Sequence, residues 1–330
     1  MTKGTKTFLI FSVSLIAIGI ALMSTGLFMG GSLFTNFSFS GGKLNVFNNS
    51  SELKEGTIPC DAFDSVCVDT SVTDICFEKG TAYSVSYCVR EEFVPQVSQQ
   101  DGRLTVFSGE SSFGINFGIF NSGSDKKELI TITVPEDFYD EAELLKLEVN
   151  GSTADVTVND LNVSGKIELS TGDIKLNNLK DISSSLSLET TTGDKKLNNC
   201  SLGELTLKSS TGDTKINNCT IDAALISEAS TGELHIDNSS AGSIDCTSTT
   251  GDITISDFSS DRYKLKTSTG DIKMKISGNE KEFDYDVHTS TGDIKIDGNK
   301  YEKSYEHTDY SSKKLINAKT STGSITVDFT

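Results

Sequence analysis

The sequence has little of what catalytic and helical proteins use most. Its 330 residues include no tryptophan, three prolines and three histidines, whereas glycine, serine, threonine, asparagine and aspartate are abundant. That composition is typical of a turn-rich β protein and not of a helical one. The three histidines are scattered, and none shares a motif with a nucleophile and an acid: His235, His288 and His307. The sequence therefore predicts neither a catalytic residue nor a cofactor.

Positive charge is also scarce. The chain carries 29 lysines and arginines against 47 aspartates and glutamates, for a formal net charge of −18. Nucleic acids and anionic lipid surfaces are bound through basic patches. The composition excludes nucleic acid as a partner and instead favours ligands that carry positive charge.

A short motif recurs through the C-terminal half. Thr-Gly followed by an acidic residue and an alternating run occurs seven times, and an eighth copy has serine in the acidic position. The glycines follow one another at intervals of 19 to 22 residues, except for a last interval of 31: Gly172, Gly193, Gly212, Gly232, Gly251, Gly270, Gly292 and Gly323. A period near 20 residues with two β-like runs in each unit is typical of a solenoid.

Alternation within each unit predicts two strands and two corners. The positions two and four residues after the glycine are mostly apolar, as at Ile174 and Leu176, and charged residues lie between them. A second run, such as Leu186 to Leu188, precedes each glycine. Glycine allows a positive φ at one corner, and the Asn-Asn pairs tolerate the left-handed region at the other, where their amides would form a ladder.

One coil alone cannot bury its apolar face, so neighbouring coils must stack. The sequence predicts an all-β fold: a single-chain parallel β-helix, or solenoid, with coils of about 20 residues and a rise of about 4.8 Å. The Gly-Gly-x-Gly-x-Asp motif of calcium-binding β-rolls is absent.

The repeated Ser-Thr-Gly-Asp-Ile-Lys units behind one N-terminal apolar segment resemble a family of candidate bacterial adhesins built from β-strand repeats, which is common in Gram-positive envelopes. The resemblance covers roughly residues 60 to 330. It implies a surface-displayed solenoid, in some members linked to envelope stress, without a known active site. It supplies no catalytic residue.

The N-terminal segment predicts a membrane anchor. Residues 8–29 contain no charged side chain and are long enough to cross a hydrocarbon core of about 30 Å as a helix. Lys3 and Lys6 precede the span and acidic sequence follows it, so the C-terminal part is expected outside the cell membrane of a single-pass protein. A signal peptide cleaved near Ala21 or Gly26 is the alternative.

This gives a division of the whole chain. The predicted parts are a cytoplasmic tail (1–7), a transmembrane signal anchor (8–29), a linker (30–59), irregular N-terminal solenoid coils that cap the stack (60–149), and a regular solenoid (150–330) with an insertion at 297–314.

Charged positions beside each glycine predict two stacked columns. The acidic column contains Asp173, Asp194, Asp213, Glu233, Asp252, Asp271 and Asp293. The basic column, two residues further on, contains Lys175, Lys196, Lys215, Lys273 and Lys295. Like charges about 4.8 Å apart repel, by roughly 1 kcal/mol in water, and the adjacent lysines offset this repulsion. We interpret the columns as a structural charge ladder, with weak binding of cations or ligands as the alternative.

The seven cysteines form two groups. The cap cysteines lie within 29 residues: Cys60, Cys67, Cys76 and Cys88. An extracellular location predicts one or two disulfides among them, and their spacing does not match a zinc site. The core cysteines are Cys200, Cys219 and Cys246; we interpret them as small buried apolar residues, with a Cys200–Cys219 bond as the alternative.

The long interval before the last glycine adds aromatic residues. The insertion at 297–314 contains Tyr301, Tyr305, His307 and Tyr310. Loops that interrupt a regular scaffold often carry binding, and tyrosine suits interfaces. A ligand or protein interface is one interpretation, and a loop folded over the open C-terminal edge is the other.

Together these features predict a non-enzymatic, membrane-anchored surface protein with a binding or structural role at the cell envelope. Its expected partners are the membrane, through the N-terminal helix, and a cell-wall, protein or cationic-peptide ligand. Self-association through the solenoid ends is a further possibility. The alternatives are an envelope-stress sensor of cationic peptides and a carbohydrate-active β-helix enzyme.

Overall fold

The computed structural model describes residues 35–40, 43–48, 53–109, 115–117, 127–136, 144–308 and 314–330. These belong to two units, formed by residues 1–53 with 110–127 and by residues 54–109 with 128–330. The predicted tail and anchor (1–7 and 8–29) lie outside the described residues. Within the described ranges, no helix has the length and apolar character needed to cross a membrane.

The first unit contains a small antiparallel sheet. Its three strands are β1 (Thr35–Ser40), β2 (Lys43–Asn48) and β9 (Ile115–Phe117), in the order β2-β1-β9. The segment predicted as a linker (30–59) therefore contributes two strands to this sheet. Its last six residues form β3 (Lys54–Pro59), which belongs to the second unit.

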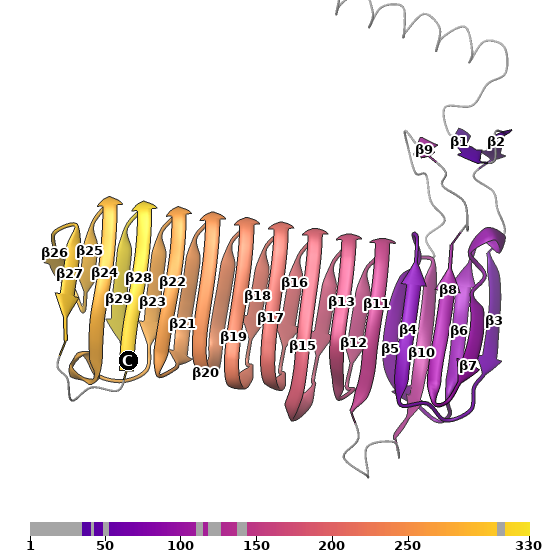
Figure 1. The fold of residues 1–330 in the computed structure, drawn as a ribbon, viewed down its shortest axis with the longest axis horizontal. Coiled ribbons are helices and arrows are strands. Elements are labelled where there is room, and N and C mark those ends of the chain that lie inside the picture. Colours follow the sequence, from indigo (N-terminus) through magenta and orange to yellow (C-terminus); the bar gives the residue numbers. More distant parts are fainter. Residues whose placement is uncertain are drawn as a thin grey trace, which may run out of the picture. The chain divides into compact units, whose positions relative to one another are not determined.

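The second unit is a stack of coils in which most coils add one strand to each of two ladders (Figure 1). In spatial order, the first ladder contains β7 (Gln96–Gln100), β8 (Arg103–Ser108), β4 (Ser65–Thr70), β11 (Leu145–Thr153), β13 (Val163–Thr171), β15 (Lys180–Thr192), β17 (Ser201–Thr211), β19 (Thr220–Thr231), β20 (Leu234–Thr250), β22 (Arg262–Thr269), β28 (Lys314–Thr322), β24 (Phe283–Thr291) and β27 (Ser304–His307).

The second ladder is built in the same way. It contains β3, β6 (Ser84–Val89), β10 (Leu129–Pro135), β5 (Asp74–Gly80), β12 (Val156–Asn159), β14 (Ile174–Asn177), β16 (Lys195–Asn198), β18 (Thr214–Asn217), the first part of β20, β21 (Ile253–Ser259), β23 (Ile272–Ile276), β29 (Ile325–Phe329), β25 (Ile294–Ile296) and β26 (Asn299–Tyr301).

The core lies between the ladders and consists of stacked apolar rows. In the second ladder Leu176, Leu197 and Ile216 occupy one register position and are each 0% exposed. Each such side chain contributes roughly 1.5 to 3 kcal/mol when fully buried, but only if the next coil covers it. The predicted all-β solenoid with coils of about 20 residues is confirmed.

The corners explain why the repeat keeps its glycine. Gly212 has φ of 139°, and a Cβ built on it would lie 2.1 Å from the carbonyl oxygen of Gly193 in the neighbouring coil. Only glycine combines this backbone with so close an approach. At the other corner Asn199 and Asn218 have φ of 56° and 54°. Asn218 Nδ2 donates to Asn199 Oδ1 at 3.3 Å, which confirms the predicted amide ladder.

Coils at both ends are out of chain order. The coil of β28 and β29 pairs with β22 and β23 on one side and with β24 and β25 on the other. Its glycine, Gly323, therefore lies between Gly270 and Gly292. At the opposite end, β4 lies between β8 on the outside and β11 on the inside, and β5 lies between β10 on the outside and β12 on the inside. At the C-terminal end, therefore, the coil that comes last in the chain is interior. At the N-terminal end, the coil of β4 and β5 is interior although it precedes β8 and β10 in the chain.

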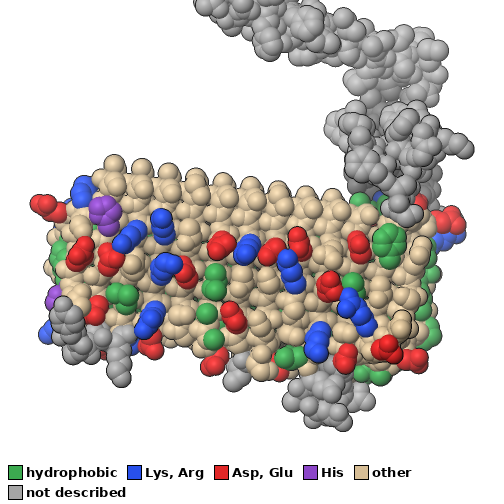
Figure 2. Space-filling view, in the orientation of Figure 1, with side chains coloured by type: hydrophobic (Ala, Val, Ile, Leu, Met, Phe, Trp, Pro, Cys, Tyr) green, Lys and Arg blue, Asp and Glu red, His purple; other side chains and the backbone are tan. Residues whose placement is uncertain are grey.

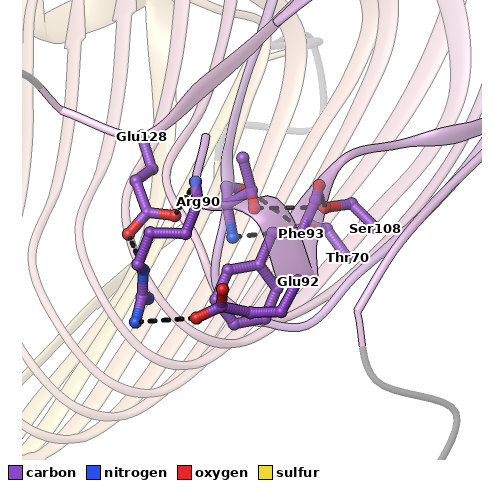
Figure 3. A network of polar contacts seen from close by, with 7 residues as sticks. Thr70, Arg90, Glu92, Phe93, Ser108 and Glu128 are labelled. Carbon is purple, nitrogen blue, oxygen red and sulfur yellow. Dashed lines mark hydrogen bonds and ion pairs between the residues drawn. The ribbon is translucent and has the colours of Figure 1, made fainter. Parts of the chain in front are cut away.

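The N-terminal end is closed by antiparallel strands and a short helix. β7 pairs antiparallel with β8, and β6 with both β10 and β3. The 3-10 helix η1 (Glu91–Phe93) places Phe93 against the core at 8% exposure. Arg90 contacts Glu128 at 2.6 Å and lies over the ring of Phe93, while Ser108 Oγ donates to the Phe93 carbonyl at 2.8 Å (Figure 3).

The C-terminal end is closed in a similar way. β26 pairs antiparallel with β25, and β27 with β24. The 3-10 helix η3 (Glu280–Glu282) precedes β24 and is capped by the Asn279 side chain, which accepts from the Lys281 amide at 3.1 Å. The Lys303 ammonium donates to the carbonyl of Gly292, the outermost glycine of the corner column.

Candidate functional site

The acidic column is held by backbone amides. Asp173 Oδ1 accepts from the amide of Asp194 at 2.9 Å, and Asp194 Oδ1 accepts from the amide of Asp213 at 2.8 Å. The same contact recurs from Asp213 to Glu233, from Asp252 to Asp271 and from Asp271 to Ser324. At the end of the column the contact is different, because the Asp293 amide donates to Ser324 Oγ at 3.2 Å. Each of these amides offsets part of the repulsion between neighbouring carboxylates.

Lysines of the basic column add ion pairs at two places. Lys175 lies 3.7 Å from Asp173, and Lys273 lies 3.4 Å from Asp271 and 3.8 Å from Asp252. The Ser324 amide, and then Lys273, hold the pKa of Asp271 below its ordinary value. The remaining lysines of the column are exposed: Lys196, Lys215 and Lys295. The sequence therefore locates both columns, but amides contribute more contacts to the acids than lysines do.

The cap cysteines are not joined by disulfides, since the structure contains none among its seven described cysteines. Cys67 lies on β4 in the first ladder and Cys76 on β5 in the second. Cys88 lies on β6, which is separated from β5 by β10. A disulfide requires Cα atoms within about 7 Å of each other. Cys67, Cys76 and Cys88 thus lie on strands that are not neighbours, and the predicted staple is not formed among them in this structure.

The core cysteines are packed as small apolar side chains. Cys200, Cys219 and Cys246 are at most 2% exposed. The Cys200 amide donates to Cys219 Sγ at 3.4 Å, and no bond joins the pair. The neighbouring Cys200 and burial raise the pKa of the Cys219 thiol, and burial raises that of Cys246.

The aromatic residues of the insertion cover the outermost coil at the C-terminal end, that of β24 and β25. The rings of Tyr301 and Tyr305 have centroids 4.0 Å apart, and Tyr305 lies 5.6 Å from Tyr285 of β24. Burial raises the pKa of both Tyr285 and Tyr305. His307 is exposed at the end of β27, and Tyr310 lies outside the described residues. This placement matches the expectation of a loop folded over the C-terminal edge.

A buried lysine interrupts the core near the middle of the stack. Lys195 is 1% exposed and occupies the inward position filled by Ile174 in the preceding coil. Its Nζ donates to Thr190 Oγ1 at 2.6 Å. Burial lowers the pKa of Lys195 to about 8. This buried lysine could have been predicted from the sequence, because Lys195 stands two positions after Gly193, where most other repeats have an apolar residue.

A shallow groove of about 660 Å³ runs along the outer side of the first ladder. We call it the axial groove, because it crosses successive strands close to their C-terminal ends. One wall is the charged row: Asp69, Asn150, Glu168, Glu189, Lys208, Glu228 and Thr247. The other wall is the hydroxyl row: Ser152, Ser170, Thr191, Ser210 and Ser230. The floor row between them contains Gly151, Leu169, Thr190, Ser209 and Ala229.

The two walls differ in electrostatic character. Lys166 lies 2.8 Å from Glu168 and 3.0 Å from Glu189, so one ammonium serves two carboxylates. Lys208 alternates with the acids further along the row. The hydroxyl row belongs to an uncharged band that follows the arrowhead edge of the first ladder, coloured tan in Figure 2. The groove thus has one charged wall and one neutral hydroxylated wall.

Sequence reasoning did not single out this groove. Its signal is present, because the two positions before each repeat glycine are always serine or threonine, and the fourth position before it is charged in four successive coils. Within the described ranges, no group of three or more potential metal-ligating side chains occurs.

Comparison with known proteins identifies the family of the chain. The model of the Toastrack DUF4097 family matches residues 63–328. Among solved structures, a candidate adhesin from Bacteroides fragilis is 17% identical, with 84% of this chain and 98% of that chain covered and a TM-score of 0.42. A candidate adhesin from Parabacteroides distasonis is 13% identical, with the same coverage and a TM-score of 0.43.

A third solved structure has a different name. A protein from Parabacteroides distasonis described as a candidate lipid-binding protein is 13% identical, with 84% of this chain and 98% of that chain covered and a TM-score of 0.41. A search of the curated proteins gives no significant match.

Proposed function

The chain belongs to the Toastrack DUF4097 family, and from this premise we propose that it is a non-enzymatic surface protein that binds a ligand of the cell envelope along its solenoid. The observation that carries the proposal is the axial groove, a continuous hollow on an otherwise regular scaffold. The ladders make this scaffold rigid, and a rigid site loses little conformational entropy on binding.

Residues 8–29 are proposed to hold the protein in the cell membrane, with the solenoid outside. The support is the uncharged length of this segment and the two lysines before it. Extraction with alkaline carbonate tests this part. The wild-type chain should stay with the membranes, and Leu15→Arg should release it. Release of the wild-type chain would contradict the anchor.

A carbohydrate-active enzyme is less well supported. Glycosidases need one protonated carboxyl and one carboxylate near each other. Glu168 and Glu189 are adjacent in register, but Lys166 ion-pairs with both of them. The pair therefore lacks the asymmetry that an acid and a base require.

An envelope-stress sensor of cationic peptides is the second candidate. Its support is the net charge of −18 and the carboxylates of the charged row, Asp69, Glu189 and Glu228. Binding of this kind would weaken strongly with salt.

Pull-down with the detergent-solubilised full-length protein tests the proposal against intact cell wall and cationic peptides at two salt concentrations; membranes are left out, because the proposed anchor alone would retain the protein on them. We expect retention on an envelope fraction that persists at high salt. Retention only on cationic peptides, lost at high salt, would favour the sensor. Retention on no fraction would contradict a binding role.

A further inference from the structure

We infer that the small sheet of the first unit lies flat on the membrane, with one apolar face against the acyl chains of the lipids. This inference rests on the proposed membrane anchor, since it assigns a second membrane contact to the chain that follows residues 8–29. Two observations support it: the division of the sheet into an apolar and a polar face, and the few residues that separate the sheet from the proposed span.

The strand register collects apolar residues on one face. Directly opposite residues of antiparallel strands belong to the same face, and successive rows alternate between the two faces. Two complete rows on one face contain apolar residues only: Phe37, Val46 and Phe117 in one row, and Phe39, Leu44 and Ile115 in the other. Neighbouring positions on all three strands of this face are therefore apolar, and half of them are phenylalanine.

The opposite face is polar. The complete row between those two contains Ser38, Asn45 and Asn116, and the row beside the β1–β2 turn contains Ser40 and Lys43. Lys43 is the one charged residue in these three strands, and Phe47 is the one apolar residue on this face. Such segregation is typical of an antiparallel sheet that has one face covered and the other in water.

The chain brings this sheet close to lipid. A single layer of three strands is stable only when its apolar face is covered. Residues 30–34 are the whole link between the proposed span and β1, and five residues extend to at most about 18 Å. The headgroup layer itself takes up roughly 5 to 8 Å of that distance. β1 therefore begins within reach of the bilayer surface, which offers an apolar partner of any required area.

The backbone limits how the sheet can meet the bilayer. An open sheet has unpaired amides and carbonyls along its edge strands, here β2 and β9, and such groups do not occur in the hydrocarbon region. The sheet therefore cannot insert with an edge first. Lying flat, it keeps its edges among the headgroups, while the apolar rows reach about 5–10 Å into the boundary between headgroups and acyl chains, as interfacial helices do.

The lack of tryptophan in the chain provides a selective probe. Full-length Phe39→Trp is reconstituted in phosphatidylcholine vesicles with and without brominated acyl chains, which quench tryptophan that contacts them. We expect brominated lipid to remove about half of its emission or more, because residue 39 faces the acyl chains. Ser38→Trp is the matched control, since it is the adjacent residue of β1 and lies on the polar face; its emission should fall by less than about a tenth.

A third variant, Leu15→Trp, places the probe in the proposed span and separates failure of the inference from failure of the anchor. Quenching of Leu15→Trp without quenching of Phe39→Trp would overturn the inference and leave the anchor standing, because protein and not lipid would then cover the apolar face. Equal quenching of Phe39→Trp and Ser38→Trp would also overturn it, since the two faces would not differ. No quenching in any variant would overturn both proposals.

Folding of the variants is checked by circular dichroism, and each spectrum should match that of the wild type. Phe37→Trp repeats the measurement in the neighbouring apolar row, so the result does not depend on one substitution. It should be quenched as strongly as Phe39→Trp, and a Phe37→Trp variant that folds but is not quenched would contradict a flat sheet.

Discussion

Replacing the buried lysine should stabilise the protein at neutral pH. Lys195 occupies an apolar position at 1% exposure, and its ammonium donates to Thr190 Oγ1. Burial lowers its pKa from 10.5 to about 8, although Asp194 and Glu189 act in the opposite direction. Lys195→Met keeps a side chain of similar length and flexibility and removes the charge.

The magnitude follows from the pKa difference. Each pKa unit corresponds to 1.36 kcal/mol, so the shift of Lys195 from 10.5 to about 8 corresponds to about 3 kcal/mol of destabilisation by the charged form. The variant also loses the hydrogen bond to Thr190, which lowers its stability by about 1 kcal/mol. The variant should therefore be more stable than the wild type by about 2 kcal/mol at pH 7.

The pH dependence has a definite sign. The unfolded chain keeps the Lys195 proton up to about pH 10.5, whereas the folded chain releases it near pH 8. Because the unfolded state binds more protons between these values, wild-type stability should rise with pH across that window. The penalty is fully present below about pH 8. The advantage of the methionine variant should therefore shrink toward pH 10.5.

Urea unfolding of the full-length protein at pH 7 and pH 10, followed by circular dichroism, measures this difference. Lys196→Met is the matched control, since Lys196 is the adjacent lysine and is exposed; it should change neither the stability nor its pH dependence noticeably. A Lys195→Met variant less stable than the wild type at pH 7 would refute the reasoning, because the buried ammonium would then be net stabilising.

Three further predictions concern the corners, the last coil and the cysteines. Gly212→Ala should lower the free energy of unfolding by roughly 3 kcal/mol or more, through backbone strain and contact with the next coil. Gly298→Ala, at φ of 77° in open space, should lower it by only about 1 kcal/mol. Thermal unfolding compares the two variants. Deleting residues 314–330 should expose the whole C-terminal end to limited proteolysis, because it leaves a gap between coils; protection equal to that of the wild type would contradict the coil order. Alkylation followed by mass spectrometry without reduction should label all four cap cysteines in the folded protein and the core cysteines, including Cys246, only after unfolding.

The regular part of the fold could be predicted because each of its signals is local. Glycine spacing gives the coil length, and alternation at positions such as Ile174 and Leu176 gives the buried face. The asparagine corners follow from the same residues. The contacts of the acidic column could not be predicted in full. Whether Asp194 faces a lysine or the Asp213 amide depends on the backbone at the corner, which no side-chain pattern specifies.

The order of the coils could not be predicted either. Parallel register depends on which apolar rows meet, and near-identical repeats offer near-identical rows. Ile272 pairs with Ile325, and Ile294 pairs with Ile325 from the other side. Any of these isoleucines would fit beside another. The one trace in the sequence is the interval of 31 residues before Gly323, which is long enough for the chain to pass along the outer coil and return.

This order also gives a physical reason for the insertion. A stack of parallel coils leaves a row of unpaired amides and carbonyls at each end, which is a template for pairing with another chain. Here the final coil is interior, and short antiparallel strands occupy the outside. β26 and β27 contribute three and four residues, and they carry Lys300 and Glu306. The outermost edge is therefore short, charged and opposite in direction to the parallel ladders. Continuous end-to-end stacking in the parallel register would require these strands to detach first. The tyrosines that they carry, Tyr301 and Tyr305, pack on each other and on Tyr285 of β24 and therefore serve closure of the end.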